Sequence, residues 1–161
     1  MQCVWLEAPL VDTDLSGYAK LRQNTKVAIL PAGNTLLAAE LMTLGIEQKA
    51  WDALRTDVTY AGGFSGCKPI AQLAQTHKLP LELQSWGYTL TQAANLHLML
   101  STPNAAYFEQ AVPYASHEAL CHTPIQTQNG FVKAPTAAGL GIEMDWDKIR
   151  DQAIVHFHIG H

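Results

Sequence analysis

Short apolar runs alternate along residues 1–109 with segments whose apolar residues recur at helical spacing. Because the runs are apolar throughout rather than alternately apolar and polar, they predict strands that are buried on both faces of a parallel sheet. The order of strands and helices predicts an α/β fold in which each helix crosses over between two parallel strands. The predicted strands are Cys3–Leu6, Lys26–Ala32, Ala53–Thr56, Leu79–Leu83 and Ala105–Phe108.

Four helices are expected between these strands, and residues at their ends carry start and stop signals. We expect Thr35 to cap the second helix and Gly45 to end it. For the third helix we expect Ser65 as the cap and Pro69 in the tolerated first turn, and the fourth begins at Thr89 or Thr91. The apolar stripes of the four helices are Leu15–Leu21, Leu36–Leu44, Ile70–Ala74 and Ala93–Leu100.

Residues 110–161 break this alternation and are rich in proline and glycine. They predict loops with one short helix near Asp145–Gln152 and a final strand at Ile154–Ile159. No linker or low-complexity tract divides the chain, so we expect residues 1–161 to form a single domain with an irregular tail.

A polar residue follows each of the five predicted strands. These residues are Glu7, Asn34, Asp57, Gln84 and Glu109, at intervals of 27, 23, 27 and 25 residues. Each interval is the length of one strand–helix unit. The C-terminal ends of parallel barrel strands converge on one rim, which carries the chemistry, so we expect these side chains to share a cavity. Carboxylates gathered there repel one another unless a cation or a proton lies between them.

Charge and composition exclude several classes of function. The chain has 10 Lys and Arg against 14 Asp and Glu, so a net charge of −4 gives it no electrostatic attraction to nucleic acid or to an anionic membrane. No stretch approaches the roughly 20 apolar residues of a membrane span, and the N-terminus lacks a secretory signal pattern. Three widely spaced cysteines without a CxxC pair indicate reduced thiols and a cytoplasmic location.

The segments that carry the strand-end residues resemble the C-terminal part of the enolase superfamily, in its mandelate racemase/muconate lactonizing enzyme branch, and especially the acid-sugar dehydratases. The resemblance implies a TIM-type barrel. A complete barrel needs roughly 250 residues and the chain has 161, so we expect a partial (β/α) barrel of about five parallel strands with outer helices. The matching segments are Val4–Leu10, Thr56–Val58, Ala61–Gly63, Ser85–Gly87, Ala93–Leu98, Tyr107–Glu109, Pro135–Thr136 and Gly139–Gly141.

The chemistry implied by the resemblance is proton abstraction next to a substrate carboxylate, with Mg²⁺ stabilising the enediolate. Glu7 matches a metal ligand of the family, and Asn34 stands where a second ligand, a glutamate, is expected. Asp57 matches the aspartate that orients a histidine base, and Gln84 stands where that histidine is expected. Glu109 matches the glutamate that hydrogen-bonds the substrate carboxylate or the enediolate.

The departures from the family pattern predict a chain that is inactive by itself. Asn34 takes one charge from the metal site, so we expect Mg²⁺ to bind weakly or not at all. Gln84 does not titrate near neutral pH, and losing a positioned base costs roughly 10²–10⁴ in rate. The chain begins just before the strand that bears Glu7. We therefore expect it to lack the capping domain and the strands with the lysine acid/bases and the first metal ligand.

Two alternative functions stay open. The chain is half of an active Mg²⁺-dependent lyase or isomerase that another chain completes, or it is a non-catalytic binding module for small carboxylates such as acid sugars. In the second case Asp57, Gln84 and Glu109 act as hydrogen-bonding groups. An open partial barrel has unpaired strand edges, which predict a homo-oligomer or pairing with a chain that supplies complementary strands.

Overall fold

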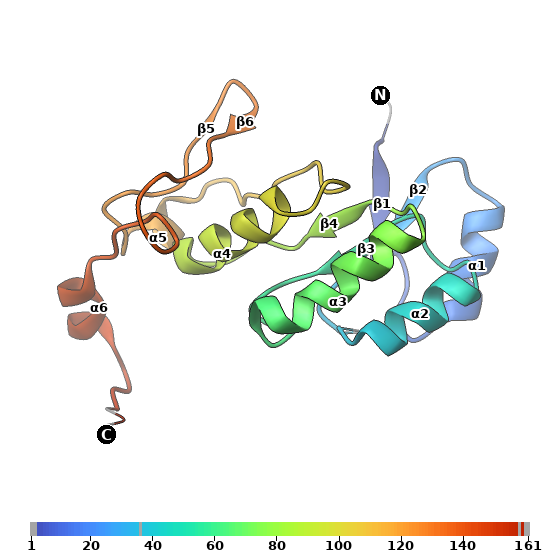
Figure 1. Ribbon diagram of the computed structural model, residues 1–161, viewed down its shortest axis with the longest axis horizontal. Coiled ribbons are helices and arrows are strands. Elements are labelled where there is room, and N and C mark those ends of the chain that lie inside the picture. The colour runs from blue at the N-terminus through green and yellow to red at the C-terminus, as the bar shows by residue number, and fades with distance from the viewer. Residues whose placement is uncertain (1–2, 36, 158, 160–161) are drawn as a thin grey trace.

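Strands and helices alternate through the first hundred residues, as predicted (Figure 1). The structure is a computed structural model that describes residues 3–35, 37–157 and 159. The elements of this part are β1 (Trp5–Glu7), α1 (Leu15–Gln23), β2 (Ala28–Leu30), α2 (Ala39–Glu47), β3 (Leu54–Thr56), α3 (Gly63–Thr76), β4 (Leu81–Leu83) and α4 (Thr89–Leu100). The α/β class and the four predicted helices are confirmed.

The strands form two separate parallel pairs rather than one closed barrel. β1 pairs with β2, and β3 pairs with β4. The two pairs are joined where the backbone N–H of Asp52 donates to the carbonyl of Ile29, at 2.9 Å. With only three residues in each strand, the ladders are short and the barrel stays open.

The predicted fifth strand, Ala105–Phe108, is not formed. Phe108 makes one isolated parallel bridge to Leu83, and the N–H of Leu81 donates to the carbonyl of Asn104. The segment therefore has extra residues between its two contacts with β4, as in a bulge, and the regular ladder is lost. It still runs alongside β4, which places Glu109 near the ends of β3 and β4.

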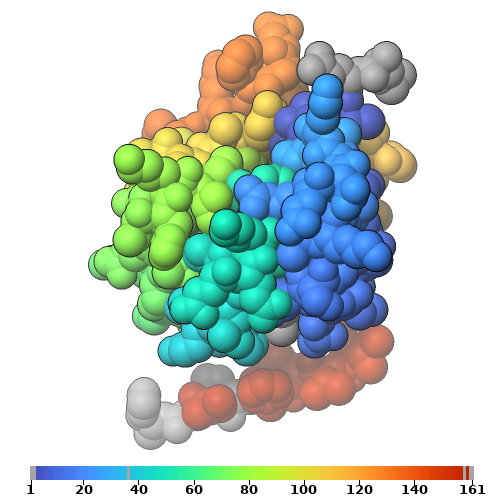
Figure 2. Space-filling view, turned by 90° about the vertical axis from the view of Figure 1, so that its right-hand side faces the viewer, coloured from blue at the N-terminus to red at the C-terminus, as the bar shows by residue number. Residues whose placement is uncertain are grey.

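The core lies between the strands and helices α1, α2 and α3, which Figures 1 and 2 show gathered into one body. Strand residues alternate between the two faces of a sheet, so Leu54 and Thr56 of β3 face this core while Arg55 faces the opposite side. Thr56 donates its hydroxyl to the buried Cys67 thiol of α3. The remaining cysteines differ in depth, Cys3 being exposed and Cys121 partly buried, and all three are free.

Two predicted helix ends were wrong. Gly45 does not end α2, which continues to Glu47; a Cβ there would lie 2.1 Å from the Trp51 ring, so Gly45 makes room for packing. The helix begins after Ala38 rather than at Thr35. Leu36 lies outside the described residues.

The third helix also begins earlier than predicted. Gly62 is the residue before α3, and Ser65 is already inside it without making a capping bond. Pro69 therefore lies in the helix interior instead of the first turn. The fourth helix does begin at Thr89, one of the two starts expected.

The C-terminal part contains short elements outside the strand–helix alternation. These are α5 (Ala115–Glu118), an antiparallel hairpin of β5 (Thr127–Gln128) and β6 (Phe131–Val132), and α6 (Trp146–Gln152). The last of these is the short helix predicted near Asp145–Gln152, and Asp145 caps it. The predicted strand at Ile154–Ile159 is absent from its described residues, 154–157 and 159. No helix within the described ranges is both long and apolar enough for a membrane span.

Candidate functional site at the strand ends

A buried arginine pairs with two of the predicted site residues, Glu7 and Glu109. Arg55 is the middle residue of β3 and is only 2% exposed. Its Nη1 lies 2.5 Å from Oε2 of Glu7, and its Nη2 lies 2.7 Å from Oε2 of Glu109. The carboxylates come from β1 and from the segment beside β4, so one guanidinium links residues 102 positions apart in the chain.

A glycine makes room for this arginine. A Cβ at Gly33, just after β2, would lie 2.5 Å from Cγ of Arg55 and 2.8 Å from its Cδ. Gly33 also has a φ of +77°, which other residues adopt only with strain. The aliphatic stem of Arg55 therefore runs against bare backbone on its way to the two carboxylates.

A second network holds Asp57 and Gln84 together through Asn95 of α4. The Asn95 amide donates to Oδ1 of Asp57 at 3.0 Å and to the backbone carbonyl of Gln84 at 3.1 Å. Its own side-chain oxygen accepts from the N–H of Val58. Asp57 is fully buried and also accepts from the N–H of Thr59. This network fixes the loops that follow β3 and β4.

Two oxygens in this second network lack partners. Oδ2 of Asp57 and the side-chain oxygen of Gln84 are buried and find no hydrogen-bond partner among the described residues. A buried acceptor without a donor is costly, and such groups in native proteins often belong to functional sites. A hydroxyl or an amide is the kind of group that such oxygens would accept from.

The fifth predicted site residue, Asn34, stands apart from both networks. It is exposed, and its side-chain oxygen accepts a hydrogen bond from the Thr35 hydroxyl. The structure thus brings Glu7 and Glu109 together through Arg55, and Asp57 and Gln84 together through Asn95. Asn34 enters neither set, although its neighbour Gly33 contacts Arg55.

Electrostatics connect the two networks. The pKa of Glu109 is raised above its usual range mainly by burial, and the Glu7 and Asp57 carboxylates add to the rise. Arg55 opposes this effect by favouring the charged form of Glu109. Glu82, which is opposite Arg55 in the β3–β4 register, is buried too, and burial raises its pKa to about 7. One positive charge thus faces several acidic groups.

The side chains present do not fit a magnesium site. The Glu7 carboxylate, which the resemblance assigned to the metal, is held by Arg55. Within the described part of the chain, no group of three or more His, Cys, Asp or Glu side chains is placed to hold a metal ion. Magnesium favours octahedral oxygen coordination and gives up water reluctantly, so an amide and an engaged carboxylate offer it little.

Aromatic side chains cluster beside this site, on the loop after β4 and on α5. The His117 ring stacks on Tyr114 with 4.9 Å between ring centroids and lies 5.3 Å from Trp86 and 5.5 Å from Tyr88. Trp86 and Tyr88 are more than half exposed. The cluster therefore presents two rings to solvent a few residues after Gln84.

Sequence reasoning missed Arg55 and Asn95. Arg55 lies inside an apolar run, so it looked like one exception in a buried strand; a charged residue two positions before Asp57 was the available signal. Asn95 lies in the apolar stripe of a helix, where a polar residue buried among apolar neighbours usually has a specific partner. In both cases the residue type was informative, but only the fold shows what it binds.

The family model "Enolase C-terminal domain-like" matches residues 1–148. The chain belongs to the enolase superfamily. Its relatives lie in the mandelate racemase/muconate lactonizing enzyme branch, as the resemblance predicted.

Individual members of the superfamily are similar over most of this chain. D-galactarolactone cycloisomerase of Agrobacterium fabrum is 29% identical over 156 residues, covering 91% of this chain and 41% of that enzyme. A solved structure from Pseudovibrio sp., assigned to the mandelate racemase/muconate lactonizing enzyme group, is 41% identical with a TM-score of 0.90 and covers 94% of this chain and 41% of that one. The chain spans about two fifths of the length of these superfamily members.

A third similar structure contains a ligand of interest. It is a mandelate racemase-type protein from Bordetella bronchiseptica RB50 complexed with 2-oxoglutarate/phosphate, 31% identical with a TM-score of 0.87. It covers 98% of this chain and 43% of that one. Another solved enolase of this fold, 24% identical, contains bound magnesium, and this level of identity supports the shared fold alone.

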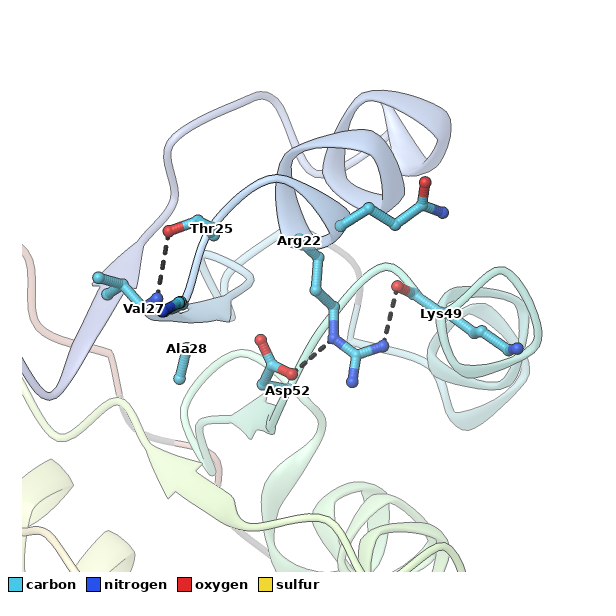
Figure 3. A pocket seen from close by; sticks show the side chains of 8 residues that line it. Arg22, Thr25, Val27, Ala28, Lys49 and Asp52 are labelled. Atoms are coloured by element: carbon cyan, nitrogen blue, oxygen red, sulfur yellow. Dashed lines mark hydrogen bonds and ion pairs between the residues drawn. The ribbon is translucent and has the colours of Figure 1, made fainter.

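A separate pocket of about 450 Å³ lies at the opposite ends of the strands (Figure 3). There the Nε of Arg22 is 2.5 Å from Oδ1 of Asp52, and the arginine also donates to the carbonyl of Lys49. The other oxygen of Asp52 accepts from the N–H of Ile29 at 2.8 Å. This pocket sits at the joint between the two strand pairs, away from the predicted site residues.

Proposed function

We propose that this chain forms the C-terminal half of an acid-sugar site that binds a sugar carboxylate but does not abstract a proton by itself. The observation that carries the proposal is the pairing of Asp57 and Gln84 through Asn95. This pair follows adjacent strands, where the family is expected to have an aspartate and a histidine base. Here an amide takes the place of the base.

The side chains present suit binding of a polyhydroxylated acid. Sugar hydroxyls are donors, and the unpartnered oxygens of Asp57 and Gln84 are acceptors. The exposed rings of Trp86 and Tyr88 offer apolar surface for the C–H face of a sugar. The cycloisomerase and dehydratase names of the relatives, and the 2-oxoglutarate complex, support a small carboxylate as ligand.

Gln84, Arg55 and Glu109 do not replace the missing base. An amide does not accept a proton near neutral pH, so Gln84 cannot do so. A guanidinium has no free lone pair that acts as a base, so Arg55 cannot do so either. Glu109 is held by Arg55. We therefore propose that another chain supplies the base for proton abstraction.

Ligand binding and proton exchange test the proposal separately. Thermal unfolding with a panel of aldonates, aldarates and their lactones should show a raised midpoint for at least one compound, and Glu109→Gln should reduce the shift. Glu143→Gln is the matched control, because Glu143 is exposed and only its backbone atoms form hydrogen bonds. Proton NMR of the same compounds in D₂O should show no loss of the α-proton signal above the blank.

Two outcomes would contradict the proposal. If the chain alone exchanges the α-proton, the proposal that it is inactive by itself is wrong. If no compound of the panel shifts the midpoint or gives heat in a titration, the binding function is wrong for those compounds.

We further propose that a second chain covers the open strand edges. β1 pairs only with β2 within the described residues, and Val4 and Leu6 are largely exposed beside its other edge. Light scattering at low micromolar concentration should then give a mass above that of the monomer. The alternative, a complementary chain that restores catalysis, predicts α-proton exchange only when the two chains are mixed. A monodisperse monomer that shows no exchange with any complementary chain counts against both.

A further inference from the structure

Arg55 brings a positive charge into a place that is otherwise acidic. It is buried on every side except where it meets Glu7 and Glu109, and the inner face of β4 adds Glu82 opposite it. Asp57 follows two residues later and contributes to the electrostatics of Glu109. If Arg55 were neutral, these carboxylates would repel one another with no cation nearby.

The surroundings of Arg55 are shaped for its side chain. Gly33 leaves the space that the aliphatic stem fills, and a Cβ there would overlap Cβ, Cγ and Cδ of Arg55. The planar guanidinium then offers its two terminal nitrogens to two different carboxylates, a geometry that a lysine ammonium cannot reproduce. These contacts hold the arginine in one position instead of leaving it free at the surface.

From these contacts we infer that Arg55 is the resident cation of this site and takes the place of a divalent metal ion. Its guanidinium binds the Glu7 carboxylate that a metal ion would need as a ligand. The same guanidinium also pairs with the Glu109 carboxylate. The site therefore keeps its shape without metal. This inference concerns charge and stability, and it stands whether or not an acid sugar binds.

Two predictions of stability follow for variants of Arg55. Arg55→Met should lower the unfolding midpoint by about 6–15 °C, because it leaves two partly buried carboxylates unpaired. The unfolding midpoint of Arg55→Lys should lie between those of Arg55→Met and the wild type. The lysine ammonium keeps the positive charge, but it cannot offer two planar nitrogens to two carboxylates. Arg22→Met is the control for a more exposed arginine: it breaks the ion pair with Asp52 at the opposite ends of the strands.

A divalent cation should rescue only the variant without its arginine. Adding about 5 mM Mn²⁺, with NaCl of equal ionic strength as the reference, should raise the midpoint of Arg55→Met by about 2–4 °C and leave the wild type and Arg22→Met unchanged. The double variant Glu7→Gln/Arg55→Met should lose this response, because Glu7 is then no longer a ligand.

Manganese binding to the wild type gives a test that does not depend on the folding of Arg55→Met. Electron paramagnetic resonance measures how much added Mn²⁺ is bound. We expect the wild type and Glu7→Gln to bind the same amount, because Glu7 is not a metal ligand in the wild type. A Glu7-dependent site of sub-millimolar affinity in the wild type would overturn the inference, and so would an Arg55→Met protein that folds and gains no response to Mn²⁺.

Discussion

Gly33 matters at the scale of single residues because it lets a long charged side chain cross the strand ends without obstruction. Its backbone has a left-handed φ of +77°, and the space beside it is filled by the stem of Arg55. Any side chain at this position faces both a strained backbone and a direct overlap. The same glycine thus serves the local turn and the arrangement of the site.

Gly33→Ala should destabilise the protein by about 2–4 kcal/mol, the sum of a left-handed backbone penalty and an overpacking penalty. Gly139→Ala is the control, because Gly139 has a similar φ of +67° and a Cβ there meets nothing within 4 Å. Urea unfolding should show a larger loss for Gly33→Ala. Equal losses for the two variants would mean that Arg55 moves aside without cost.

The strand-end positions predicted that Glu7, Asn34, Asp57, Gln84 and Glu109 share a cavity. Glu7 and Glu109 do contact one guanidinium, whereas Asn34 lies apart. These positions did not predict that Arg55 joins Glu7 and Glu109, because side-chain reach across an open barrel depends on tertiary geometry. The pairing of Asp57 with Gln84 rests on Asn95, whose amide is distant in sequence from both. The chemical roles assigned to these residues stay predictions.

At the scale of elements, Asp52 joins the two strand pairs. Its carboxylate pairs with Arg22 of α1 (Figure 3). The carboxylate also accepts from the N–H of Ile29 in β2, and the N–H of Asp52 donates to the carbonyl of Ile29. This residue lies two positions before β3 begins, so it holds β2 and β3 in position where no strand ladder connects them.

Asp52→Ala should cost about 2–3 kcal/mol of folding free energy, because the N–H of Ile29 loses its acceptor and the ion pair with Arg22 is lost. Asp52→Asn should cost about 1 kcal/mol or less, because its amide oxygen still accepts from Ile29. Arg22→Met isolates the ion pair alone. Denaturant unfolding of the three variants checks this order, and an Asp52→Ala loss no larger than that of Arg22→Met would contradict it.

Element order was predictable because each apolar run and each helical stripe is local in sequence. The hairpin β5–β6 was missed, although Asn129 and Gly130, both with positive φ, form the dipeptide that favours a tight hairpin turn. The prediction of the fifth strand was wrong for another reason. Its hydrogen-bond register against β4 depends on tertiary structure, and the extra residues between Asn104 and Phe108 prevent a regular ladder. Sequence pattern does not encode register.

For the molecule as a whole, stability depends on pH through Glu82. Burial raises its pKa from 4.5 to about 7 in the folded state, despite a backbone hydrogen bond from Tyr107 and the nearby Arg55, both of which lower it. The folded protein therefore holds this proton more tightly than the unfolded chain does. The contribution of Glu82 to the free energy of unfolding is therefore greatest below about pH 4.5, and it is lost as the pH rises through about 7.

Glu82→Gln should remove this slope, because the variant has nothing to ionise. Between about pH 5 and pH 8 the wild type should lose up to about 3 kcal/mol relative to Glu82→Gln, and Glu143→Gln should follow the wild type. The measurement is the free energy of unfolding in urea at several pH values. Parallel curves for wild type and Glu82→Gln would show that Glu82 ionises freely in the folded protein.

The depth of the three cysteines has a consequence for chemical labelling. A maleimide should modify Cys3 within seconds and Cys121 more slowly, whereas Cys67 lies beneath Thr56 and burial raises the pKa of its thiol. Labelling of Cys67 then requires α3 to separate from β3. The rate of that third modification, followed by mass spectrometry, would report how often the interior opens under native conditions.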